Sequence, residues 1–361
     1  MIVQLAKFPE DGRMVAVFGA SGHTGRFVIA ELLRRGFIPI AIGRDGARLA
    51  EAGFQARGVE TRIATIEDAA SLDHAIAGAA AVINCAGPFL DTAEALGAAA
   101  IRARIHYLDV TAEQPSALAV FERFAAPARE AGVVLVPAMG FYGGLGDLLA
   151  TATMGDWTSA DEIRIGIALD SWQPTRGTRL TGQRNTARRL VVANGKLEPL
   201  PYPAPETLWT FPDPFGIQEV TELPFSETIL ISRHLRVSGV HTYLNLSPLR
   251  DLRDPSTPPP RPADDTGRSA QTFRVDVIVG NGAGVRRASA HGRDIYAFTA
   301  PLVVEAAQRI LEGAAEGGGV LAPGEMFDAR DFLRALAPEH LNFEISDDDE
   351  AAVGRVHFAS H

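Results

Sequence analysis

A glycine-rich loop near the start of the chain has the composition and placement of a phosphate-binding turn. It reads Gly-Ala-Ser-Gly-His-Thr-Gly over residues 19–25, after an apolar run at Met14–Phe18 and before a segment with helical spacing. Glycines let backbone N–H groups approach a pyrophosphate, which then lies at the positive end of the helix dipole. The G-x-x-G-x-x-G spacing differs from the commoner G-x-G-x-x-G, but its place between a strand and a helix makes the pattern specific. We therefore predict a dinucleotide cofactor bound by Gly19, Ser21, Gly22, His23, Thr24 and Gly25.

Two charged residues after the second apolar run bear on which dinucleotide binds. The run Ile38–Ile42 is followed by Gly43, Arg44 and Asp45. An arginine here suits the 2′-phosphate of NADP, because a guanidinium pairs with phosphate through two hydrogen bonds, whereas an acid suits the free ribose hydroxyl of NAD. Asp45 lies 20 residues after Gly25, a spacing at which an acid can serve NAD. Arg44 is the first side chain beyond the strand, so we favour NADP(H), with NAD(H) as the alternative.

Small residues follow the fourth apolar run and are predicted to lie beside the same cofactor. The carboxyl ends of parallel strands face the ligand crevice, and small side chains there leave room for a nicotinamide ribose. We predict cofactor contacts for Asn84, Cys85, Ala86, Gly87 and Pro88. A catalytic role for Cys85 is the less favoured interpretation, since a lone cysteine at a strand end is usually a small buried hydrophobic side chain.

Three ionisable side chains come after the fifth and sixth apolar runs. Asp109 and Glu113 follow the fifth run, and Tyr142 lies in a glycine-rich turn after the sixth. Reduction of a substrate needs a positioned proton donor. We predict Tyr142, or a water molecule bound by Asp109, as the proton source. His106 is at the opposite end of its strand and is expected to be structural, and Asp147 is expected to cap a helix.

The elements that position these residues alternate in periodicity over the first 140 residues. Short apolar runs, typical of buried parallel strands, alternate with segments whose apolar residues repeat at helical spacing. The predicted strands are Met14–Phe18, Ile38–Ile42, Glu60–Thr65, Ala81–Cys85, His106–Val110 and Val133–Val136. The helical segments are 24–35, 47–52, 71–77 (with Ser71 as N-cap), 92–104 and 116–131. This order predicts an α/β fold with a doubly wound parallel sheet of the Rossmann type.

The pattern changes after Gly140. Strict alternation and a strong Asn-Gly hairpin signal predict a second, α+β domain with a largely antiparallel sheet. The strand-like segments are 162–170, 191–197, 273–279 and 285–291. Proline-rich loops are expected at 199–205 and 255–262, and helices at 300–312 and 329–337.

Composition and missing motifs exclude several classes of protein. The chain of 361 residues has a net charge of -10, which argues against a nucleic-acid binder that uses a basic field. Cys85 is the single cysteine, so an intrachain disulfide is impossible, and we predict no metal site. The longest charge-free runs have 16 residues, whereas a spanning helix needs ~20, so we expect no membrane span and a cytoplasmic location. The sequence contains neither a P-loop motif nor a G-x-S-x-G elbow.

Five segments together resemble the saccharopine dehydrogenase-like family of NADP-dependent oxidoreductases. They are VAVFGASGHTGR, VINCAGPF, HYLDVTAE, LVPAMGFYGGLGDLL and YAFTAPLVVEAAQRIL. The resemblance implies a Rossmann domain completed by C-terminal helices, with an intervening domain for substrate and dimer contacts. On this basis we expect a Rossmann domain from residues 1–140 and 295–345, an α+β domain from 141–294 and a tail at 346–361. Two residues depart from the family pattern: Tyr142 replaces a common aspartate, and Ala112 replaces a glycine.

These features predict an NADP(H)-dependent oxidoreductase that forms a homodimer and acts on a small-molecule substrate. Hydride would pass between the nicotinamide and a C=N, C=O or C=C bond, while the protein supplies orientation and a proton. The alternative is a Rossmann protein that binds a dinucleotide without turnover, because fold does not fix function. A group of arginines could bind substrate carboxylates or could equally be solvated surface: Arg176, Arg179, Arg184, Arg188 and Arg189.

Overall fold

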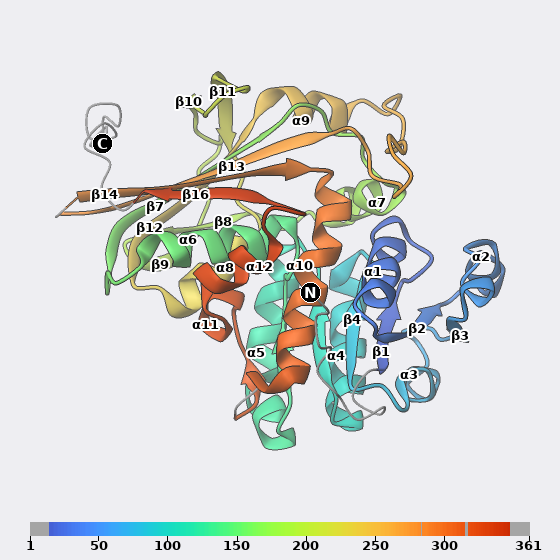
Figure 1. Cartoon of the computed structure of the whole chain (residues 1–361). Helices are drawn as coiled ribbons and strands as arrows, with labels where there is room; N and C mark the ends of the chain where they lie inside the picture. Colours follow the sequence, from blue (N-terminus) through green and yellow to red (C-terminus); the bar gives the residue numbers. More distant parts are fainter. Residues whose placement is uncertain (1–13, 283, 315–316, 347–361) are drawn as a thin grey trace, which may run out of the picture.

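The computed structural model describes residues 14–282, 284–314 and 317–346, which form two sheet-and-helix halves (Figure 1). A parallel sheet with its helices occupies the lower part of that view, and a larger mixed sheet lies above it. Apart from its first residue, Ser346, the predicted tail lies outside the described residues.

Among these residues, seven strands form the first sheet, in the order β3-β2-β1-β4-β5-β6-β15, and neighbouring strands are parallel. The strands are β1 (Met14–Phe18), β2 (Ile38–Gly43), β3 (Glu60–Ile63), β4 (Ala81–Asn84), β5 (His106–Asp109), β6 (Val134–Val136) and β15 (Gly319–Val320). The helices between them are α1 (His23–Arg34), α2 (Gly46–Glu51), α3 (Ala69–Ile76), α4 (Phe89–Ala103) and α5 (Gln114–Ala131). The predicted doubly wound parallel sheet is confirmed.

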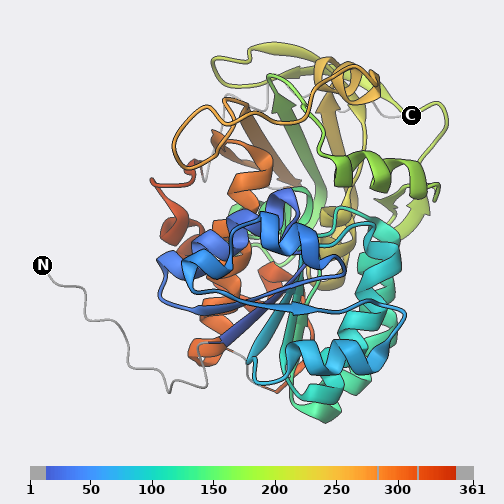
Figure 2. The ribbon, with the colours of Figure 1, turned by 90° about the vertical axis from the view of Figure 1, so that its right-hand side faces the viewer.

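Side chains of each central strand alternate between two buried faces. In β1, Val15 and Val17 pack in the core that contains α1, whereas Ala16 and Phe18 pack in the core that contains α3, α4 and α5. Helices therefore cover both faces of the sheet (Figure 2). Burial on both faces is the reason that these strands appear in the sequence as continuous apolar runs.

The second sheet follows the order β10-β11-β12-β7-β13-β14-β16, with β8 paired to β12 and to β9. Its strands are β7 (Ala160–Leu169), β8 (Leu190–Ala193), β9 (Lys196–Pro199), β10 (Glu206–Thr210), β11 (Ile217–Glu222), β12 (Val237–Asn245), β13 (Thr272–Asn281), β14 (Gly284–Arg293) and β16 (Asn342–Ser346). The helices of this half are α6 (Gly146–Met154), α7 (Arg176–Arg184), α8 (Ser226–His234), α9 (Leu246–Arg253), α11 (Pro323–Met326) and α12 (Ala329–Leu336). The pairs are antiparallel except for β7 with β12, so the predicted largely antiparallel sheet is also confirmed.

The C-terminal part of the chain returns to the first sheet. Helix α10 (Ile295–Arg309) packs against α1, and β15 pairs with β6. The expected boundary at residue 345 does not fit β16, because this strand pairs with β14 of the second sheet. The remaining domain boundaries stay predictions.

Two predicted helix caps are wrong in detail. Asp68, not Ser71, caps α3, because its carboxylate accepts hydrogen bonds from the amides of Ala70 and Ser71. Asp147 does not cap α6; its buried carboxylate accepts hydrogen bonds from His234 Nε2 at 2.7 Å and from the Gly324 amide at 2.6 Å. Asp147 thus joins α6 to α8 and α11.

Candidate functional site

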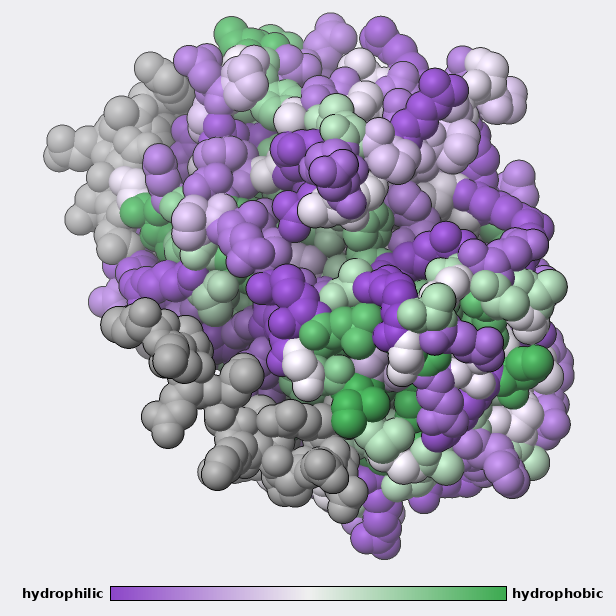
Figure 3. All heavy atoms as spheres, turned by 45° about the vertical axis from the view of Figure 1, so that its right-hand side comes forward, coloured by the Kyte–Doolittle hydropathy of each residue, from purple (hydrophilic) through white to green (hydrophobic). Residues whose placement is uncertain are grey.

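A cleft of about 1540 Å³ lies between the two halves of the molecule. One wall consists of the loops that follow β1, β2, β3, β4 and β5, and the other consists of α7 with side chains from the second half. Figure 3 shows the hollow between the upper and lower parts, with hydrophilic side chains along much of its rim. This position, outside the carboxyl ends of parallel strands, is the usual ligand crevice of such sheets.

The glycine loop forms one end of the cleft. Gly19 has a φ of +81°, and a Cβ at this position would lie 2.9 Å from Ala86. Gly22 is exposed and precedes α1 without any side-chain cap, so the first-turn N–H groups of α1 have no capping side chain. Ser21, His23 and Thr24 line the cleft beside them. The loop thus has both the close backbone approach and the free donors that a pyrophosphate requires.

Gly25 supports the loop rather than lining the cleft. A Cβ on Gly25 would collide with the carbonyl oxygen of Gly19 and the backbone of Ala20. The absence of a side chain therefore lets α1 begin directly against the turn.

Arg44 and Asp45 stand at the rim of the cleft with different environments. The Asp45 carboxylate caps α2, accepting hydrogen bonds from the amides of Ala47 at 3.0 Å and Arg48 at 3.2 Å. It also lies 3.5 Å from Arg48 Nε. The exposed Arg44 side chain makes no hydrogen bond or ion pair with the part of the chain that the structure describes. The acid that could have indicated NAD therefore has a structural partner, and Arg44 is available for a phosphate.

The segment after β4 divides into lining and supporting residues. Cys85, Ala86, Gly87 and Pro88 line the cleft, as predicted for a cofactor contact. Asn84 does not: it is fully buried, and its Oδ1 accepts a hydrogen bond from the Ala86 amide at 3.0 Å, which shapes this turn. Burial, reinforced by the negative charge of Asp109, raises the pKa of the Cys85 thiol, so this cysteine has no thiolate character.

Asp109 lies in a different place from that which the sequence indicated. Asp109 is completely buried, away from the cleft, where it accepts hydrogen bonds from the Ala138 and Thr111 amides and from the Tyr107 hydroxyl. Burial raises its pKa to about 6. These three donors occupy the carboxylate, so in place of the predicted water-binding role we assign Asp109 a positioning role.

Glu113 is the acid that reaches the cleft. Its Oε1 accepts a hydrogen bond from the Phe89 amide at 2.7 Å, while within the described residues its buried Oε2 has no partner. Burial raises the pKa of Glu113 as well.

Tyr142 lies in a stack of flat side chains on the second wall. Its ring packs between Trp172 at 5.3 Å and Phe225 at 4.2 Å between ring centroids, and the Arg189 guanidinium covers Phe225. The Tyr142 hydroxyl is buried and has no hydrogen-bond partner in the described chain. Burial raises its pKa well above the usual range, as do the nearby Tyr296 and Glu227, so the hydroxyl keeps its proton.

Helix α7 closes the cleft from the second half, and sequence reasoning missed it. Arg184 Nη2 lies 2.8 Å from Asp91 Oδ1 on α4, and Figure 2 shows α7 (yellow-green) close to α4 (cyan). Thr181 Oγ1 would be 2.9 Å from a Cβ on Gly87. The nine residues of α7 are all partly or fully exposed. The sequence of this helix therefore has no apolar periodicity from which it could be predicted.

A 3-2-1-4-5-6 parallel strand order with an uncapped glycine loop at the first strand defines a dinucleotide-binding α/β protein. Residues 15–136 match the family described as the saccharopine dehydrogenase NADP binding domain. Residues 15–136 are therefore similar to an NADP-binding domain of saccharopine dehydrogenases, as the sequence motifs indicated, and the cofactor prediction is confirmed at this level.

One solved structure supports the same fold. The apo saccharopine dehydrogenase (L-Glu forming) of Saccharomyces cerevisiae superposes with a TM-score of 0.65 at 13% identity, covering 92% of this chain and 100% of the yeast chain. A meso-dapdh mutant with DAP from Clostridium tetani E88 has a TM-score of 0.49 at 13% identity, covering 91% and 98%. No curated protein sequence matches the chain significantly. Within the described residues, the structure contains no helix that is long and apolar enough to cross a membrane.

Proposed function

We propose that the protein is an NADP(H)-dependent oxidoreductase acting on a C=N, C=O or C=C bond of a small metabolite. The observation that carries this proposal is one continuous cleft that adjoins the glycine loop, Arg44 and Tyr142. A cleft shared by cofactor-binding and proton-bearing residues is what hydride transfer coupled to protonation requires. A protein that only bound the dinucleotide would have no use for the Tyr142 hydroxyl on the second wall, which is unpartnered among the described residues.

Each part of the cleft has a separate task in this proposal. The glycine loop binds the diphosphate through backbone N–H groups, and Arg44 binds the 2′-phosphate. When bound, the nicotinamide supplies or accepts the hydride. The Tyr142 hydroxyl donates a proton to the substrate atom that gains negative charge, and Trp172 and Phe225 fix the orientation of its ring. Asp109 acts indirectly, because it orients the backbone at Ala138, which precedes Tyr142 in the chain.

Fluorescence titration of the protein with NADPH and NADH tests the cofactor part of the proposal. We expect NADPH to bind at least tenfold more tightly, ~1.4 kcal/mol, and Arg44→Ala to abolish the difference. Arg48→Ala is a matched control, because Arg48 stands on the same rim but is paired with Asp45. If NADH binds more tightly than NADPH, the assignment of Arg44 to the 2′-phosphate is wrong. If neither dinucleotide binds, the proposed oxidoreductase function is wrong.

Three finer points remain predictions: the class of bond that is reduced, the homodimer and the cytoplasmic location. A screen of imine, keto and enoyl compounds for oxidation of NADPH addresses the first. The absence of turnover with all three classes, despite NADPH binding, would favour the non-catalytic alternative.

A further inference from the structure

Three arginines on α7 differ in their surroundings. Arg184 is paired with Asp91, and Arg179 donates hydrogen bonds to the carbonyl oxygens of Asp254 and Thr257 at 3.1 and 2.9 Å. Arg176 lines the cleft, yet it makes no hydrogen bond or ion pair with the residues that the structure describes. Two of the three positive charges on this helix are thus used by the protein, and one is left for a ligand.

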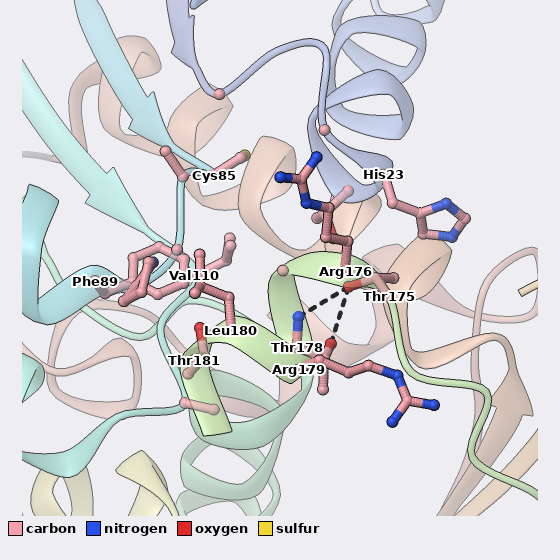
Figure 4. A pocket seen from close by; sticks show the side chains of 18 of the residues that line it. His23, Cys85, Phe89, Val110, Thr175, Arg176, Thr178, Arg179, Leu180 and Thr181 are labelled. Carbon is pink, nitrogen blue, oxygen red and sulfur yellow. Dashed lines mark hydrogen bonds between the residues drawn. The ribbon is translucent and has the colours of Figure 1, made fainter. Parts of the chain in front are cut away.

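The direction of the Arg176 side chain is visible in Figure 4. It extends from the start of α7 toward the loop between β1 and α1, whereas Arg179 extends away from that loop. The facing loop carries the uncapped N–H groups of α1. A guanidinium and a helix start that face each other across an open cleft form a two-sided site for an anion.

Tyr296 links the start of α7 to the start of α1. Its hydroxyl accepts hydrogen bonds from Trp172 Nε1 at 3.0 Å and the Thr175 amide at 3.4 Å, and it lies 2.9 Å from Thr178 Oγ1. The ring of the same tyrosine contacts the edge of His23, the first residue of α1, at 5.4 Å between centroids. The side chain of Tyr296 therefore contacts both sides of this two-sided anion site.

We propose that Arg176 binds the diphosphate of the dinucleotide, so that α7 of the second half completes the cofactor site. This inference rests on the proposed function. The diphosphate is the relevant group because it lies over the β1–α1 loop in such sheets, whereas the 2′-phosphate lies at the end of β2, near Arg44. Cofactor binding would then join the two halves of the protein directly.

The test compares two ligands in two variants. NADPH contains the diphosphate, and adenosine 2′-monophosphate lacks it. We expect Arg176→Ala to weaken NADPH about tenfold or more and to leave the affinity for adenosine 2′-monophosphate unchanged, whereas Arg44→Ala weakens both. Arg176→Lys should restore part of the NADPH affinity, because it keeps the charge but not the two-pronged geometry. Arg57→Ala, which removes an exposed arginine outside the cleft, should stay within about threefold of the wild type, and thermal unfolding verifies that each variant is folded.

The outcomes separate this inference from the proposed function. If the wild type binds NADPH and Arg176→Ala binds it equally well, the inference is wrong and the proposed function stands. Equal losses for both ligands in Arg176→Ala would overturn the diphosphate assignment. An equal loss in Arg57→Ala would also overturn it, because the loss of any positive charge, rather than a contact of Arg176 with the diphosphate, would then be responsible. If the wild type does not bind NADPH, the proposed function itself fails.

Discussion

The two walls of the cleft are built in different ways. The cofactor wall consists of turns at the ends of β1, β2 and β4, where each feature depends on residues that are close in sequence. The opposite wall depends on side chains that are far apart, such as Tyr142, Trp172, Phe225 and Tyr296. Most residues that we propose to bind the dinucleotide therefore lie in short motifs, whereas the side chains that we propose to act on the substrate come together only when the chain is folded.

This difference also governs how each wall should fail. A turn that needs a positive φ and a close backbone approach is strained by any residue larger than glycine, so we expect one substitution to disrupt it. In a stack of rings, a substitution can remove a single functional atom and leave the stack intact. A single substitution in the cofactor wall should thus disrupt binding, whereas substitutions in the opposite wall should affect binding and chemistry separately.

Gly19→Ala should have the largest effect. The added Cβ would lie 2.9 Å from Ala86 on a backbone with φ of +81°. We expect NADPH affinity to fall by more than 100-fold, about 3 kcal/mol, together with a lower melting temperature. Gly53→Ala is the matched control, because Gly53 also has a positive φ, +69°, but open space around it. If both variants bind NADPH like the wild type, the glycine loop is not the diphosphate site.

Tyr142→Phe should affect chemistry and spare cofactor binding. The substitution keeps the ring stack and removes only the hydroxyl. We expect turnover to fall by about 100-fold with an unchanged affinity for NADPH, as a lost general acid would give. Tyr243→Phe provides a control from the second half, away from the cleft. Unchanged turnover in Tyr142→Phe would eliminate this residue as the proton donor.

Asp109→Asn should have the smallest effect, on the pH dependence of stability. Because burial raises the pKa of Asp109 from 3.8 to about 6, the folded state binds this proton more tightly than the unfolded state. Its contribution is fully present below the unfolded pKa and is lost as pH rises through the folded one. Between pH 4 and 6 the wild type should therefore lose on the order of 2 kcal/mol of unfolding free energy relative to Asp109→Asn. Urea unfolding at both pH values measures this, and parallel curves would contradict it.

The sequence predicted the first half of the fold well and the second half incompletely. Strands buried on both faces, such as β1, can be recognised in the sequence as apolar runs between turn residues. The hairpin of β8 and β9 is indicated by Asn194-Gly195. Strands β10, β11 and β12 and helices α7 and α8 were not predicted. The residues of these elements make contacts across the sheet or along the cleft, and such contacts produce no simple hydrophobic periodicity in the sequence.

The candidate site shows the same limit at the level of single residues. The glycine loop, Arg44 and the turn after β4 could be located from local motifs, although Gly25 and Asn84 turned out to support the cleft rather than line it. Asp109 lies away from the cleft, and Glu113 lines it, because sequence does not show which of two neighbouring acids is buried among backbone donors. Tyr296 had no signal at all, since its role depends on α7 and on His23.

The late strand β15 has a consequence for synthesis of the protein. Gly319 pairs beside β6 but follows Val136 by 183 residues, and α10, which covers α1, is also made late. At a translation rate of ~5–20 residues per second, the first sheet waits roughly 10 to 40 s for its last strand. Throughout that interval the open edge of β6 and the apolar side of α1 face solvent or a chaperone. The motif-rich half of the protein, made first, is thus expected to remain prone to aggregation on the ribosome until β15 has been made.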